Sequence, residues 1–294
     1  MRADSALVAH AGVAADGRAE RRRRRWKTAG RYLLLTVLAV VVLFPIYITI
    51  VNSLLRPDQI AGHPPSLFPN HPQWHTYRIA WTSGHMGRYL LNSAIVTTLI
   101  VVGQVTFAIL AAYAFAFLEF PGRNLLFVLF LATMMVPFEV VFFTNYQTIA
   151  DLGLLNSYGG LVIPFLATGF GAFLLRQAFL TMPRDLRDAA SLDGLGHMRF
   201  LWRVVVPLAR PTVAALSVFA FLSAWGQYLW PLVATNTEKV RTVQVGLRQL
   251  RDTSLDNVNV TFAGVVLASI PLVILLLVFQ RQLVRGLTAG AVKG

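Results

Sequence analysis

Long apolar runs alternate along the chain with short polar segments. A helix needs about 20 mainly apolar residues to cross the hydrocarbon core of a bilayer, and six stretches reach or exceed that length. They cover residues 32–54, 89–118, 124–146, 158–180, 211–235 and 260–283. The pattern predicts an all-α, polytopic membrane protein with six transmembrane helices.

The composition supports this class. Of the 294 residues, 56% are hydrophobic and 13% are charged, whereas a soluble domain carries roughly 25% charged residues. The mean hydropathy is +0.60. The chain has no cysteine, which excludes disulfides, a thiolate nucleophile and any metal site that needs Cys ligands.

A run of arginines, Arg21–Arg25, precedes the first apolar stretch. A basic region before an apolar run is also typical of a cleavable signal peptide, and paired arginines are typical of a twin-arginine export signal. The apolar run continues to residue 55 and no small-x-small cleavage site follows it, so we expect an uncleaved first span. Because the basic residues flank apolar runs, they indicate topology rather than nucleic-acid binding.

Lysine and arginine are distributed unevenly among the segments between the spans. Most lie in the N-terminal tail, the turn at 119–123, residues 176–210 and the C-terminal tail. Loops rich in Lys and Arg stay on the cytoplasmic side of a membrane. We therefore expect both termini and residues 176–210 to face the cytoplasm.

Sequence motifs of catalysis are missing. The chain has no Gly-x-x-x-x-Gly-Lys-Ser/Thr loop for ATP, no His-Glu-x-x-His and no Gly-x-Ser-x-Gly. His71 and His75 are four residues apart, but Pro72 follows the first, and we interpret both as solvated loop residues rather than metal ligands. We expect neither an enzyme nor a metal or cofactor bound by this chain.

Glu139 is the clearest ionisable residue inside a predicted span. It follows Pro137, which we expect to kink the helix. Ionisable residues within spans are candidates for function, so Glu139 either faces a cavity or gate, or lies near the outer headgroups. An ion-coupled secondary transporter is the alternative function, although such proteins usually show more buried carboxylates or matching broken helices in two halves.

Aromatic and amide side chains mark the fifth predicted span, in the sequence SAWGQYLWPL. Its aromatic residues, Trp225, Tyr228 and Trp230, form either an aromatic belt at the outer membrane surface or part of a polar lumen that suits sugars. An amide within a span needs a polar partner or a wet cavity. The candidates for a substrate pathway are Glu139, Asn92, Gln104, Trp225, Gln227 and Tyr228.

Residues 183–210 form a polar, jointed segment between two apolar runs. Pro183 suits the first turn of a helix, and Asp193-Gly194 then breaks that helix, since glycine adopts backbone angles that other residues avoid. A second helical run is predicted to present Phe200, Val204 and Leu208 on one face. The pattern predicts two short helices bent at a glycine, lying at the cytoplasmic surface. They either rest on anionic lipid or bind a partner.

The spacing of this segment is informative. Asp188-Ala189-Ala190, Gly194 and Val204-x-Val206-Pro207 resemble the Glu-Ala-Ala motif of permease subunits of bacterial ABC importers: Glu-Ala-Ala, three residues, Gly, nine residues, Ile-x-Leu-Pro. Asp replaces the usual Glu. The stretches FLLRQAFLTMPRDLRDAASLDG, WGQYLWPL and RGLTAGAVKG resemble the carbohydrate-importer branch and are similar to the second maltose permease. Together with NSYGGLVIP, they look closest to sn-glycerol-3-phosphate and glycerophosphodiester permeases.

This resemblance implies the type I ABC importer permease fold in a bacterial plasma (inner) membrane. It implies a heterodimer with a second permease, two ATPase subunits that hold ATP and Mg²⁺, and an extracytoplasmic solute-binding protein. The solute would be a sugar, glycerol-3-phosphate or a glycerophosphodiester. The residues expected to couple to the ATPase are Asp188, Ala189, Ala190, Asp193, Gly194, Phe200 and Pro207.

The resemblance also divides the chain. Residues 1–31 form a basic cytoplasmic tail, 32–87 the first span and an extracytoplasmic loop, and 88–283 the transmembrane domain, with a coupling helix at 183–207. Residues 284–294 form a cytoplasmic tail, which either lies against the ATPases or frays.

Overall fold

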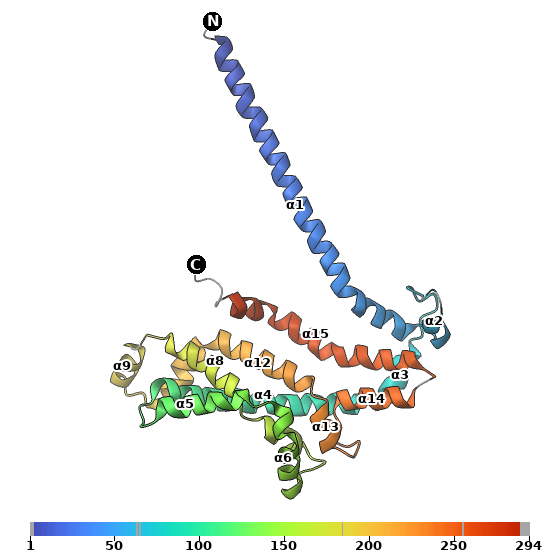
Figure 1. Ribbon diagram of the computed structural model, residues 1–294, viewed down its shortest axis with the longest axis vertical. Coiled ribbons are helices and arrows are strands. Elements are labelled where there is room, and N and C mark those ends of the chain that lie inside the picture. The colour runs from blue at the N-terminus through green and yellow to red at the C-terminus, as the bar shows by residue number, and fades with distance from the viewer. Residues whose placement is uncertain (1–2, 63, 65, 184, 255, 289–294) are drawn as a thin grey trace.

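The computed structural model describes residues 3–62, 64, 66–183, 185–254 and 256–288, and every regular element in these ranges is a helix. Side chains are described between Arg25 and Gln280 of this part. Figure 1 shows an elongated bundle from which the N-terminal half of helix α1 (Ala3–Leu54) extends away from the other helices. The all-α fold predicted from the sequence is confirmed.

Helix α4 (Met86–Phe117) lies at the centre of the bundle. It packs against α8 (Gly169–Leu180) and α12 (Arg210–Trp225), and α12 packs in turn against α15 (Val258–Thr288). Helix α1 packs on α15 from the outside. The order of packed helices is therefore α8, α4, α12, α15 and α1, with α4 and α12 enclosed most fully.

Shorter elements close the two ends of the bundle. We call the end that carries α9 the α9 end, and the opposite end, which carries α3 and α14, the α14 end (Figure 1). The remaining elements are α2 (Pro57–Ala61), α3 (His75–Trp81), α5 (Arg123–Ala132), η1 (Thr133–Met135), α6 (Phe138–Asp151), α7 (Tyr158–Val162), η2 (Ile163–Phe165), α9 (Asp185–Leu192), α10 (His197–Phe200), η3 (Leu201–Val205), α11 (Val206–Leu208), α13 (Leu229–Ala234) and α14 (Val243–Thr253).

Three helical segments are long and apolar enough to cross a membrane unbroken, and up to six spans result if three bent pairs each count as one. The unbroken segments are Arg25–Leu54, Met86–Phe117 and Val258–Gln280. The bent pairs are Arg123–Met135 with Phe138–Asp151 (95°), Tyr158–Phe165 with Gly169–Leu180 (49°), and His197–Leu208 with Arg210–Trp225 (82°).

The bend before α6 has a clear cause. Pro137 has no N–H to continue the helix, and the residue before a proline avoids helical backbone angles. Val136 accordingly adopts an extended conformation, with φ −83° and ψ 114°. The predicted kink at Pro137 is confirmed, and its size means that the depth of Glu139 does not follow from counting residues along a straight helix.

Helices α1 and α12 do not begin and end with the segments predicted from the apolar pattern. The basic N-terminal region and the first span form one continuous helix, α1, with no break between residues 31 and 32. The fifth predicted span, 211–235, is by contrast divided in two. Helix α12 ends at Trp225, and α13 begins at Leu229 after a short break. Composition identified the apolar stretch, but the break at Gly226 divides it.

The core at the α9 end joins the polar segment to the bundle. Its buried side chains come from α4, α8, α9, α10, η3 and α12, and include Tyr113, Phe179, Phe200, Leu201 and Val205. Burial of a large apolar side chain contributes about 1.5–3 kcal/mol. Several such side chains therefore hold α10 and η3 firmly against α4 and α8.

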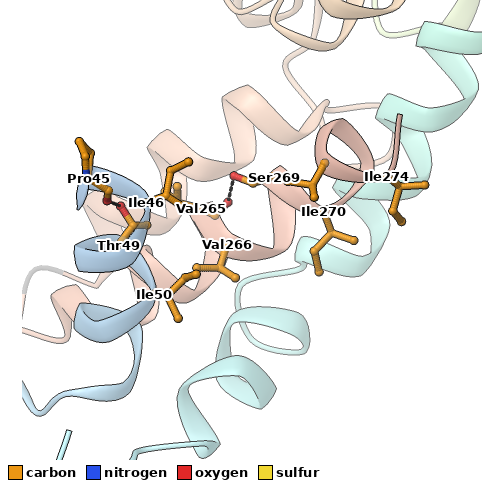
Figure 2. A pocket seen from close by; sticks show the side chains of 10 residues that line it. Pro45, Ile46, Thr49, Ile50, Val265, Val266, Ser269, Ile270 and Ile274 are labelled. Atoms are coloured by element: carbon orange, nitrogen blue, oxygen red, sulfur yellow. Dashed lines mark hydrogen bonds between the residues drawn. The ribbon is translucent and has the colours of Figure 1, made fainter. Parts of the chain in front are cut away.

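A groove of about 400 Å³ lies between α1 and α15 (Figure 2). Its lining is apolar apart from two hydroxyl groups, Thr49 and Ser269. Thr49 Oγ1 donates to the Pro45 carbonyl and Ser269 Oγ to the Val265 carbonyl, both at 2.8 Å. Because both hydroxyl protons are used within their own helices, this groove offers little to a polar solute and suits apolar chains.

Candidate functional site

The jointed segment after α8 has the geometry that its sequence predicts. Helix α9 ends at Leu192. Gly194, just after it, has a φ of 73°, in the left-handed region. The Leu195 N–H donates to the Ala190 carbonyl at 2.8 Å, and the Gly194 N–H to the Ser191 carbonyl at 3.1 Å. A left-handed glycine with this pair of bonds is a Schellman-type helix end. We call residues 183–208, without Arg184, the α9 segment.

The inner face of the α9 segment packs on the bundle. Ala190 and Phe200 belong to the buried core at the α9 end, together with Leu201 and Val205. The small side chain of Ala190 lets α9 approach its neighbours closely. Two of the predicted coupling residues, Ala190 and Phe200, therefore hold the segment in place, rather than facing outward.

The second half of the segment does not keep a regular helical face. Leu201–Val205 form a π-helix, whose wider turn rotates the residues that follow. Val205 and Ala209 are buried as a result, while Leu208 is 55% exposed. The prediction that Leu208 shares the face of Phe200 and Val204 is wrong for this reason.

The outer face of the α9 segment combines acidic and apolar side chains. Asp188, Ala189 and Asp193 are exposed, and Leu192 is 90% exposed. Met198 on α10 is exposed as well. Among the described residues, no cation forms an ion pair with Asp188 or Asp193. The uncovered Leu192 and Met198, beside exposed carboxylates, make this face a candidate surface for binding a partner.

Pro207 lies at the junction of this segment with the fifth span. It is half-buried in α11, and the chain turns by 82° between His197–Leu208 and Arg210–Trp225. Proline has no N–H for the helical ladder, and Pro211 follows at the start of α12. The two prolines therefore lie on either side of the turn.

Among the candidates for a substrate pathway, Asn92 is fully engaged inside the protein. It is 2% exposed. Its Nδ2 donates to the carbonyls of Lys239 and Arg241 at 3.0 and 2.9 Å, and its Oδ1 accepts from the Tyr158 hydroxyl at 2.7 Å. Asn92 thus fixes the loop before α14 to α4 and to α7.

Gln104 and Glu139 lie near two of the helix breaks. Gln104 Nε2 donates to the Phe165 carbonyl at 2.8 Å. This carbonyl lies at the end of η2, where the helix is interrupted before α8 begins. Glu139 is exposed in the first turn of α6, where a negative charge is favoured by the helix dipole. Neither side chain contacts the other.

The tryptophans of the fifth span are buried in the bundle. Trp225 is 3% exposed, and its Nε1 donates to the Ala268 carbonyl at 3.2 Å. Trp230 is also buried and donates to the Gly160 carbonyl at 3.0 Å. The interpretation of these two residues as an outer aromatic belt is therefore wrong: each ties one helix to another inside the protein.

Gln227 and Tyr228 occupy the break between α12 and α13. Gln227 Oε1 is buried and has no hydrogen-bond partner among the described residues. The Tyr228 hydroxyl accepts a hydrogen bond from Nη1 of Arg248 on α14. This bond raises the pKa of Arg248, so its guanidinium remains charged. An amide oxygen without a described partner, a hydroxyl and a cation thus adjoin an interrupted helix.

Sequence reasoning missed Arg248. A signal was available, because Gln244, Arg248 and Asp252 recur at a spacing of four and give α14 a polar face. Arg248 Nε lies 3.8 Å from Asp252 Oδ2, and Gln244 Nε2 donates to the Trp225 carbonyl at 3.3 Å. This polar face therefore lies against the break in the fifth span.

A second network fixes α14 onto α4. Gln249 Oε1 accepts from the Tyr89 hydroxyl at 3.2 Å and from Arg241, and Gln249 Nε2 donates to Glu238 at 3.3 Å. A Cβ on Gly246 would lie 2.1 Å from the ring of Tyr89, so only glycine allows this approach.

Curated relatives align with most of the chain. It is 39% identical over 264 residues to the sn-glycerol-3-phosphate transport system permease protein UgpE of Yersinia pestis bv. Antiqua (strain Antiqua), covering 87% of this chain and 94% of that protein. It is 37% identical over 265 residues to the protein of the same name from Brucella abortus (strain 2308), with the same coverage.

Solved structures share the fold. A chain in the crystal structure of a bacterial ABC transporter involved in the import of the acidic polysaccharide alginate matches with a TM-score of 0.78 at 24% identity, covering 87% of this chain and 96% of that chain. A chain of the bacterial alginate ABC transporter in complex with an alginate pentasaccharide-bound periplasmic protein matches with a TM-score of 0.59 at 16% identity. The predicted importer-permease fold is confirmed.

The family described as "Binding-protein-dependent transport system inner membrane component" matches residues 104–289. That range includes the α9 segment, the break between α12 and α13, and α14. Members are components of transporters rather than enzymes. This chain therefore belongs to the family of inner membrane components of binding-protein-dependent transport systems.

Proposed function

We propose that this chain is one of two permease subunits of an ATP-driven importer and that its α9 segment binds an ATPase subunit. The observation that carries the proposal is the uncovered face of α9, with Leu192 90% exposed beside the exposed carboxylates of Asp188 and Asp193. The chain has no phosphate-binding loop of its own, so ATP and Mg²⁺ are held by the partner.

The proposed assembly contains a second, different permease, two ATPase subunits and an extracytoplasmic solute-binding protein. The family description names binding-protein-dependent transport, and one structural neighbour was solved with a periplasmic protein bound to its solute. In this assembly both termini and the α9 end face the cytoplasm, and the α14 end faces the binding protein. The C-terminal tail, residues 284–294, was expected either to lie against the ATPases or to fray, and its residues 289–294 lie outside the described residues.

The packing of the α9 end suits transmission of force. A displacement of α9 by the ATPase acts on Ala190 and Phe200, whose side chains lie in one core with Tyr113 of α4 and Phe179 of α8. Close-packed cores transmit strain because they compress little. ATP binding would thereby shift the spans and alternate the access of the pathway between the two sides.

For the solute, we propose an anionic phosphoester such as glycerol-3-phosphate or a glycerophosphodiester. The relatives at 37–39% identity carry the name of sn-glycerol-3-phosphate permeases. Gln227, Tyr228 and Arg248 lie together at the break in the fifth span. They offer an amide, a hydroxyl and a fixed cation, which suit the hydroxyl and phosphate groups of such a solute. Sugars remain the second solute class for the test.

The experiment is reconstitution of the chain with its permease partner, ATPase and binding protein in liposomes. We expect uptake of a phosphoester only with ATP inside and the binding protein outside. Uptake by the chain alone, driven by a pH gradient, would establish the ion-coupled alternative instead. Uptake of a neutral sugar but not of a phosphoester would overturn the solute assignment and leave the importer function intact.

A further inference from the structure

Four side chains form a cluster that bridges the glycine joint of the α9 segment. Arg187 lies on α9, before the joint, and His197 and Phe200 lie on α10, after it. The fourth, Tyr113, belongs to α4. We call these residues the Arg187 cluster. Of these four, only Phe200 is among the residues predicted from the sequence to couple to the ATPase.

Each side chain of the cluster contacts at least one other. The Tyr113 hydroxyl lies 2.9 Å from His197 Nδ1. Arg187 Nη2 lies 3.2 Å from both ring nitrogens of His197. The guanidinium carbon of Arg187 is 5.2 Å from the centre of the Phe200 ring. Together they connect α9 to α10 and α10 to α4.

The equal distances define how Arg187 meets the histidine. A nitrogen in the plane of the imidazole and equally far from both ring nitrogens would overlap the ring carbon between them. Arg187 Nη2 therefore lies over the face of the His197 ring. A planar guanidinium packs well on aromatic faces, and the guanidinium of Arg187 contacts the rings of both His197 and Phe200.

No carboxylate accounts for the position of Arg187. Among the described residues it forms no ion pair, and its Nη1 is buried without a hydrogen-bond partner. Buried polar atoms without partners are rare and call for a reason. The stacking contacts are what define its place, and they are sensitive to the relative angle of α9 and α10.

The two glycines of the joint carry no side chain that would resist bending. Gly194, at φ 73°, and Gly196 are exposed, and a Cβ on either would meet no atom within 4 Å in the described part of the chain. Glycine also restricts its backbone less than other residues. A force applied to α9 could therefore be lost in rotation at the joint unless side chains across it hold the angle.

We propose that Arg187 and His197 are positioning residues that fix the angle between α9 and α10 and tie this joint to α4 through Tyr113. The displacement of α9 by an ATPase then reaches α4, a central helix of the pathway, instead of being lost at Gly194. The inference rests on the proposed function and deepens it. The Arg187 cluster is the contact through which the α9 segment acts on a span.

Three variants of the assembled transporter test this proposal: Tyr113→Phe, His197→Ala and Arg187→Gln. The readout is solute transported per ATP hydrolysed, measured beside the amount of assembled complex. We expect Tyr113→Phe, which removes one hydroxyl, to lower this ratio by about fivefold, since a hydrogen bond contributes about 1 kcal/mol. We expect Arg187→Gln and His197→Ala to lower it by about tenfold, because each removes the contact of a cation with an aromatic face, which contributes up to about 2 kcal/mol when the cation is desolvated.

The matched control is Tyr77→Phe, at the α14 end. Its hydroxyl lies 2.7 Å from Ser53 Oγ, so the same atom and one comparable contact are removed far from the joint. We expect its transport per ATP to equal that of the unmodified protein. The double variant Arg187→Gln/Tyr113→Phe should lose less than the product of the two single effects, because the residues act through one chain of contacts.

Several results would overturn the proposal. One is an unchanged ratio in Tyr113→Phe and Arg187→Gln. Another is a smaller amount of complex with a normal ratio, which would show a role in assembly only. If the unmodified chain does not assemble with an ATPase at all, the proposed function fails and this inference fails with it. Normal coupling in both the unmodified protein and the variants would overturn the inference alone.

Discussion

The two ends of the bundle differ in how far the chain completes them by itself. At the α14 end, Asn92 and Gln249 join the loop and helix after the fifth span to α4 and α7 through several hydrogen bonds. At the α9 end, the inner face is packed but the outer face leaves Leu192 and two carboxylates uncovered. Around Asn92 and Gln249 the chain pairs its own polar groups, whereas the outer face of α9 has the form of half an interface.

We therefore expect substitutions at the two ends to have different effects. Changes at the α14 end should act on stability and on the recognition of solute, because its polar groups bond within the chain or lie at the broken span. Changes at the α9 end should leave the chain folded and alter how ATP hydrolysis is linked to transport. Substitutions at matched sites of the two ends test this division.

The largest expected effect is on stability at the α14 end. Asn92→Ala removes two donors and one acceptor from a buried site, leaving the carbonyls of Lys239 and Arg241 without this partner. We expect the free energy of unfolding to fall by about 2–3 kcal/mol, measured by denaturation in detergent micelles. The surviving folded protein should transport a normal amount of solute per ATP. A reduced ratio would contradict the division between the two ends.

At the α9 end, Gly194→Val should uncouple the transporter. A left-handed backbone costs a residue with a Cβ about 1–2 kcal/mol, and more for a branched one, so the turn at φ 73° should open and displace α9. We expect insertion to remain normal while transport per ATP falls by about tenfold. Gly196→Val is the control, since Gly196 has an ordinary φ of −69°. Wild-type uptake in Gly194→Val would contradict the coupling role.

Recognition of solute should depend on Arg248. Arg248→Gln removes the cation that contacts Tyr228, and we expect the apparent KM for a phosphoester to rise by about tenfold, consistent with loss of one charge-assisted hydrogen bond. Uptake of a neutral polyol should change little. Arg251→Gln, in the last turn of the same helix, is the control for net charge. Equal effects of both variants would indicate general electrostatic attraction rather than a contact.

The smallest expected effect concerns the acidic residue of the motif. Asp188 is exposed and faces away from the core, so Asp188→Glu, which adds one methylene, should keep transport per ATP within about twofold. Asp188→Asn should lower it more, since hydrogen bonds to charged groups are stronger than those to neutral ones. Steady-state ATP hydrolysis and uptake by the same vesicles measure both. A larger loss in the Glu variant than in the Asn variant would show that side-chain length matters more than charge.

Features fixed by local chemistry could be predicted from the sequence. Pro137 and Gly194 act on their own backbone and on that of their neighbours, so the kink and the turn follow from residue type. The long apolar runs likewise predict helices that can span a membrane. The bend angles do not follow, since they depend on packing with distant helices.

Features that depend on distant partners could not be predicted. The π-helix at Leu201–Val205 moves Leu208 to the surface, although simple periodicity places it with Phe200. Trp225 meets the Ala268 carbonyl and Arg248 meets Tyr228 only after folding. Periodicity reports which residues share a face, but the partner of that face lies elsewhere in the chain.

The most direct test of the ATPase interface uses the absence of native cysteine. Leu192→Cys places a single thiol on the outer face of α9, where the leucine is 90% exposed. Phe68→Cys is the control, since that residue is 71% exposed and follows α2, at the α14 end. In the assembled transporter, a thiol–amine cross-linker should join the Leu192 variant, and not the Phe68 variant, to the ATPase subunit. Cross-linking of neither variant, with the Leu192 thiol equally reactive in the presence and absence of the ATPase, would contradict the account.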